Sequence, residues 1–162
     1  MFESEATLHR LNRTYLNRLM ADYPESELDA QPHPGLHSCR WILAHLAIVS
    51  EGCLKQLGHP TESPAAWFAS YGPATAPGSH PTVRPSREEL LAAIEKGYDR
   101  LLAAAKSAPP ELLAAPHGIE RLNWTGLITK GELISHALAT HFAVHVGQLS
   151  TLRRLRGFEP LF

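Results

Sequence analysis

Apolar residues recur at spacings of three and four in four long segments of the chain. This period is that of an amphipathic α-helix with one buried face. It predicts long helices over residues 4–22, 39–57, 86–107 and 129–156. No segment shows the strict alternation of apolar and polar positions that is typical of a β-strand. The pattern therefore indicates an all-α protein, and we expect the four long helices to form a four-helix bundle.

Local sequence signals mark the starts of the third and fourth long helices and the connection between the second and the third. Ser86 with Glu89, and Thr129 with Glu132, have the spacing of a capping box. The stretch that joins the second long helix to the third is rich in proline, with one short helix predicted over residues 65–70. A connection of this length can cross the height of a bundle, so we expect these two long helices to run parallel.

Composition narrows the class of protein. With 162 residues, of which 44% are hydrophobic, the chain can bury the core of one domain, which we place over residues 1–162. Its 15 basic and 16 acidic residues include no basic run, which disfavours nucleic acid as the main partner. No run of about 18 apolar residues is present, so we expect no membrane-spanning helix. The N-terminus lacks the apolar segment of a secretory signal, so we expect a cytoplasmic protein.

Two histidines interrupt the apolar stripe of the fourth long helix. His141 and His145 are four residues apart, so both side chains point to the same side of a helix, toward the interior. Burying imidazoles among apolar side chains is costly unless their nitrogens find partners. A metal ion shared by the pair is one solution, and hydrogen bonds to neighbouring helices are the other.

A second helix must supply any third ligand, and His45 is the candidate. It lies at the edge of the apolar stripe of the second long helix, where a hydrogen-bonded core histidine is the alternative. Three imidazoles without a carboxylate suit Zn²⁺ or Ni²⁺ best, with iron and manganese as further candidates. Three protein ligands leave one position for water or substrate, as in catalytic zinc sites.

Most of the ten histidines are expected to take no part in such a site. His136 lies five residues before His141, about 140° away on an α-helical wheel, so it should point elsewhere. For His37, which precedes the second long helix, a place near the mouth of the site is the alternative to a solvated surface position. We interpret all the remaining histidines as solvated surface residues, with that one alternative: His9, His33, His37, His59, His80 and His117.

Two further side chains are candidate cofactor-binding residues. Trp41 lies one helical turn before His45 and forms either a wall of the site or part of the core. Gln148 lies on the same face as His145 and either orients a ligand or forms a hydrogen bond between helices.

Three short motifs carry a resemblance to a known family. They are Pro-His-Pro-Gly at residues 32–35, Trp-Ile-Leu-Ala-His-Leu at 41–46 and His-Phe-Ala-Val-His-Val-Gly-Gln-Leu at 141–149. In sequence and spacing they resemble the second and fourth helices of the DinB-like superfamily. The resemblance implies an up-down-down-up bundle, a homodimer, and a divalent metal ion on His45, His141 and His145. Members of this family include S-transferases and isomerases that use bacillithiol, mycothiol or glutathione.

Three hypotheses for function follow. The first is a metal-dependent enzyme that transfers a low-molecular-weight thiol to a small electrophile, or a related hydrolase. No Asp or Glu falls on the faces of the three histidines, so no general base is evident, which favours thiol transfer over hydrolysis. The second is a non-catalytic protein of a stress response that binds a metal or a small molecule. The third is a bundle with three core histidines and no metal.

Overall fold

The computed structural model describes residues 2–79 and 81–161. Within these ranges every regular element is a helix, and the only β-type pairing is one isolated bridge between Pro116 and Thr129. The predicted all-α class is therefore confirmed. The α-helices in chain order are α1 (Glu3–Met20), α2 (Cys39–Gln56), α3 (Ala65–Tyr71), α4 (Arg87–Ser107), α5 (Pro110–Ala114), α6 (Lys130–His136) and α7 (Phe142–Leu155).

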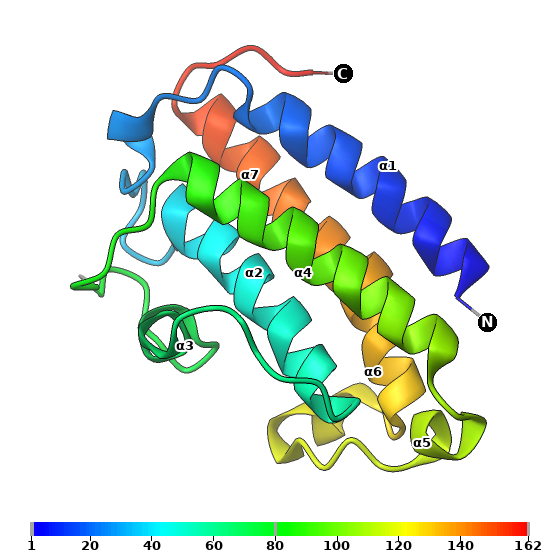
Figure 1. Cartoon of the computed structure of the whole chain (residues 1–162). Helices are drawn as coiled ribbons and strands as arrows, with labels where there is room; N and C mark the ends of the chain where they lie inside the picture. Colours follow the sequence, from blue (N-terminus) through cyan, green and yellow to red (C-terminus); the bar gives the residue numbers. More distant parts are fainter. Residues whose placement is uncertain (1, 80, 162) are drawn as a thin grey trace.

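The long helices lie side by side along one axis. Figure 1 shows α1, α2, α4 and the continuous α6–α7 segment packed lengthwise, with α1 and α6–α7 running in one direction and α2 and α4 in the other. The connection from α2 to α4 carries α3 along the outside of α2 and returns to the end where α2 begins. The expected parallel course of the second and third long helices is thus what the structure shows.

Helix α2 is the most enclosed element and carries the side chains that matter for the site. Most of its residues are buried, since α4, α3 and α7 all pack against it. Its first turn is fixed by Ser38, whose hydroxyl accepts a hydrogen bond from the backbone N–H of Trp41. His45 lies in the middle of this helix and is buried.

Both predicted capping boxes are present at the helix starts. Ser86 and Glu89 form reciprocal hydrogen bonds at the start of α4, and Thr129 and Glu132 do so at the start of α6.

Among the described residues, no helix combines the length and the apolar character that crossing a bilayer requires.

The prediction of one uninterrupted α-helix over residues 129–156 is wrong in one respect. A π-helical turn, η3 (Ala137–His141), lies between α6 and α7. Hydrogen bonds in a π-turn run between residues five apart, which adds one residue to the turn and rotates everything before it relative to everything after it. The helix has the predicted extent, but its two halves do not share one α-helical wheel.

Two histidines predicted to lie on the surface are buried instead. His9 is packed between the rings of Tyr98 and Phe142, with ring centroids 4.6 and 4.8 Å away. His117 is buried in the loop before α6, where its ring accepts a hydrogen bond from the backbone N–H of Ile119. His80 lies outside the described residues.

Candidate metal centre

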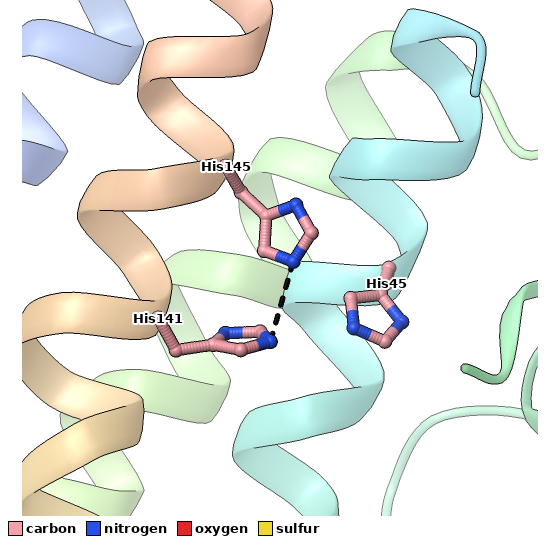
Figure 2. Close-up of side chains that lie close together, drawn as sticks. All are labelled: His45, His141 and His145. Atoms are coloured by element: carbon pink, nitrogen blue, oxygen red, sulfur yellow. Dashed lines mark hydrogen bonds between the residues drawn. The ribbon is translucent and has the colours of Figure 1, made fainter. Parts of the chain in front are cut away.

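Three histidines from two neighbouring helical segments converge on one point. Figure 2 shows the ring of His45, from α2, turned toward the rings of His141, at the end of η3, and His145, in the first turn of α7. One ligand nitrogen from each ring lies within 4.8 Å of the other two. The Nε2 atoms of His141 and His145 are 3.2 Å apart. Two nitrogens bound at about 2.0–2.1 Å to a tetrahedral ion are about 3.3–3.4 Å apart, so this spacing fits a shared metal ion.

Hydrogen bonds fix which nitrogen of His45 is free. Its Nδ1 lies 3.0 Å from the backbone carbonyl oxygen of Tyr71, at the end of α3. A carbonyl oxygen can only accept, so Nδ1 carries the proton and donates it. The Nε2 atom is therefore left with a lone pair, which is the form that binds a metal ion.

A second hydrogen bond acts on His145 in the same way. Its Nδ1 lies 2.8 Å from Oε1 of Gln148, one turn further along α7. With the amide oxygen as acceptor, the proton again sits on Nδ1 and Nε2 keeps its lone pair. Gln148 thus contacts a histidine on its own helix rather than a residue of another helix.

His141 differs from the other two histidines because its second nitrogen has no partner. Its Nδ1 is buried and makes no hydrogen bond within the described part of the chain. Its Nε2 lies 3.2 Å from Nε2 of His145, so in the metal-free chain the His141 ring carries its proton on Nε2 and donates it to the lone pair of His145. A metal ion shared by the two rings would have to displace this proton.

Burial keeps these imidazoles uncharged. It lowers the pKa of His45 to about 4 and that of His141 to about 2, and it also lowers the pKa of His145. The nearby rings lower the pKa of His141 further, since they disfavour a second positive charge. At neutral pH all three rings are neutral, which is the state that a metal ligand requires.

The cluster opens onto a cavity of about 340 Å³. Both His45 and His141 line it, and it lies within the range of volumes that hold small molecules. Within the described residues, no Asp or Glu lines this cavity. Most of its other lining is apolar and comes from α2, α3, α6 and the loop before α6: Ile48, Val49, Phe68, Ile119, Leu122 and Leu133.

Comparisons with known proteins agree with this architecture. The family model of the DinB superfamily matches residues 8–149, which is most of the chain. The chain belongs to the DinB superfamily. The crystal structure of a conserved protein from Enterococcus faecalis shares this DinB-like fold, with a TM-score of 0.71 and 18% sequence identity over 96% of each chain. At that identity the likeness concerns the fold alone. The search of curated proteins found no match.

In this DinB-superfamily chain, the indole ring of Trp41 packs against His45 of the cluster. Its ring stacks on that of His45, with centroids 4.6 Å apart and an angle of 9° between the planes. His37 stacks on the other face of the same indole at 3.5 Å, and the indole N–H donates to Thr75 at 2.7 Å. Trp41 is buried and does not line the cavity, so it holds the plane of His45 rather than forming a wall.

The prediction that His136 points away from the site is wrong. The π-turn places residues five apart over one another, and the rings of His136 and His141 lie with centroids 5.5 Å apart. His136 also lines the cavity. Only knowledge of the π-turn reveals this contact, because an α-helical wheel separates the two side chains.

Arg121 is a cavity residue that sequence reasoning missed. It lies in the short 3₁₀-helix η2 (Glu120–Thr125), outside the helices that the apolar pattern predicts. No spacing or motif marks it, because only the tertiary path of the loop brings it over α2.

Proposed function

We propose that this chain is a metal-dependent enzyme that transfers a low-molecular-weight thiol to a small electrophile, or a related hydrolase. The observation that carries the proposal is the cluster of His45, His141 and His145, with ligand nitrogens within 4.8 Å, at the edge of a small apolar cavity. We assign these three histidines as the metal ligands, with Gln148 and Trp41 as the residues that hold two of them in place.

The donor chemistry fits a borderline divalent ion. Three neutral imidazoles without a carboxylate favour zinc or nickel, with iron or manganese as further candidates. Three protein ligands leave one position for a small molecule. A divalent ion bound there lowers the pKa of a thiol or of water, and so supplies a nucleophile at neutral pH.

The protein's own residues prepare the site for this chemistry. Tyr71 and Gln148 hold the protons of His45 and His145 on Nδ1 and keep their Nε2 atoms available. The apolar lining excludes water from the reacting groups, which strengthens electrostatic interactions there. Since no carboxylate of the described residues lines the cavity to accept a proton from water, thiol transfer is favoured over hydrolysis.

Among the residues that the structure describes, no acidic side chain lines the cavity, and this also supports a second candidate function. A non-catalytic protein of a stress response that binds a metal or a small molecule needs no general base. The site would then bind the same ions, but no substrate would turn over.

The proposal also covers the bundle topology, the cellular location, the oligomeric state and the substrates. We interpret the arrangement of α1, α2, α4 and α6–α7 as one up-down-down-up four-helix bundle over residues 1–162. We propose that it acts in the cytoplasm as a homodimer, on a small-molecule substrate, with a low-molecular-weight thiol as the co-substrate.

The test is a screen of the zinc- and nickel-loaded chain with glutathione, bacillithiol or mycothiol and small electrophiles, with thiol consumption as the readout. We expect turnover that His145→Ala abolishes and that His59→Ala leaves unchanged, since His59 is exposed and lies outside the cluster. Metal binding without turnover of any thiol or ester would favour the non-catalytic candidate instead.

A further inference from the structure

Arg121 is a cationic residue of the cavity beside the candidate metal centre. It lines the same cavity as His45 and His141. Arg121 is exposed, and the described residues offer it neither a hydrogen bond nor an ion pair.

The segment that carries Arg121 is held in place by its own hydrogen bonds. Buried His117 accepts from the backbone N–H of Ile119 through Nδ1 and donates through Nε2 to the carbonyl oxygen of Leu127. Its carbonyl oxygen accepts from the side chain of Gln56, which ties the loop to the end of α2. The position of Arg121 over the cavity is therefore set by the fold rather than by a freely moving loop.

Apart from His45, His136 and His141, the rest of the cavity lining among the described residues is mostly apolar, and it carries no acidic side chain. Ile48 and Val49 of α2, Phe68 of α3 and Leu133 of α6 line it, and no acidic side chain of the described residues does so. A cavity of about 340 Å³ with one cationic group and apolar walls suits a small molecule with an apolar body and a single anionic group. The planar fork of a guanidinium matches a carboxylate best, since it can donate two parallel hydrogen bonds.

We propose that this cavity binds small monocarboxylates, with Arg121 holding the carboxylate and the apolar walls holding the body of the molecule next to the three histidines. This inference rests on the proposed function in one respect: it names the substrate class of that site. Arg121 is then a specificity-determining residue, because it selects substrates that carry a carboxylate and sets which end of the molecule faces the histidines.

Matched probes test the inference without any enzyme activity. The affinities of 3-phenylpropanoate and of its neutral amide, 3-phenylpropanamide, are measured by ligand-detected NMR on the full-length metal-free chain. We expect the carboxylate to bind at least tenfold more tightly than the amide. Arg121→Gln should weaken carboxylate binding at least tenfold and leave the amide unchanged, and Arg121→Lys should retain part of the preference.

The control is Arg154→Gln, which removes an exposed arginine at the end of α7, away from the cavity. It should bind both probes like the original chain. Equal affinity for the two probes, no binding of the carboxylate up to about 10 mM, or an unchanged preference in Arg121→Gln overturns the inference.

A zinc titration of the same variants separates this result from the proposed function. Arg121→Gln should bind zinc as the original chain does, because Arg121 is not among the three clustered ligands. Carboxylate binding that depends on Arg121 in a chain that fails to bind zinc would support the inference and contradict the metal-dependent function.

Discussion

Single hydrogen bonds decide which tautomer of His45 and of His145 faces the cluster. Gln148 is exposed, yet its amide oxygen is the acceptor that keeps the proton of His145 on Nδ1. The carbonyl of Tyr71 does the same for His45 and cannot be altered by substitution. Such partners of metal ligands contribute to affinity without touching the ion.

Replacing Gln148 should therefore weaken metal binding without unfolding the protein. We expect Gln148→Leu to lower zinc affinity about tenfold, because His145 loses the acceptor that fixes its ring and its proton. Gln148→Glu keeps an acceptor oxygen and should bind zinc at least as tightly as the original chain. Competition with a chromogenic chelator measures both, and equal affinities in the Leu and Glu variants would contradict this role.

A second residue-scale prediction concerns acid stability and His9. Burial lowers its pKa from 6.5 to about 4, and its Nε2 has no hydrogen-bond partner within the described residues. The unfolded chain takes up this proton first as the pH falls, so the contribution of His9 is complete above pH 6.5 and is lost toward pH 4. At pH 5 the loss amounts to about 2 kcal/mol relative to pH 7.5.

The variant His9→Phe separates this effect from that of the other histidines. Phenylalanine keeps the ring contacts with Tyr98 and Phe142 but cannot take up a proton. Urea unfolding of the metal-free protein at pH 7.5 and pH 5 should show a smaller loss of stability in the variant, by about 2 kcal/mol. The same loss in both proteins would show that His9 is not the group responsible.

The residues of the site were predictable to different degrees. The spacing of His141 and His145 places them on one face of a helix, and the structure has both rings there, beside His45. His136 and Arg121 were not predictable in the same way. The position of the first depends on a π-turn, and that of the second depends on how a loop folds across α2.

Helix boundaries were the most predictable feature at the scale of elements, because capping is local chemistry. The side chains of Ser86 and Thr129 make their predicted bonds at the starts of α4 and α6. The phase of a helix across η3 was not predictable, because no residue type specifies a π-turn. The packing of one helix against another explains a π-turn better than the helix propensities of single residues do.

The contact between α2 and α4 gives an element-scale prediction. Gly97 of α4 faces Ser50 of α2, and a methyl group added at Gly97 would overlap the Ser50 hydroxyl. That hydroxyl donates to the carbonyl oxygen of Ala47 at 2.7 Å, so moving it breaks a buried hydrogen bond. We expect Gly97→Ala to lower the free energy of unfolding by about 1 kcal/mol, since overpacking outweighs the gain in helix propensity.

The double variant Ser50→Ala/Gly97→Ala checks the cause. With the hydroxyl removed, Gly97→Ala should become neutral or stabilising, which thermal or urea unfolding measures. A stabilising effect of Gly97→Ala in the original background would contradict the close packing of α2 on α4.

For the whole molecule, the balance of charge limits the choice of partners. The net charge is −1 from 15 basic and 16 acidic residues, and phosphate contacts supply most non-specific affinity for DNA. We expect no binding of duplex DNA tighter than about 1 µM at pH 7.5 and about 150 mM salt, measured by fluorescence anisotropy. Submicromolar binding under these conditions would show a basic surface that the composition does not indicate.

The central claim is that three histidines, brought together by α2, η3 and α7, form one metal site. The most direct test is calorimetric titration of zinc into the original chain, His141→Ala and His59→Ala, with circular dichroism as a check on folding. We expect one tight site per chain in the original protein and in His59→Ala, and its loss in His141→Ala with the helical signal unchanged. Tight zinc binding that survives in folded His141→Ala, or that is absent from the original chain, would contradict the claim.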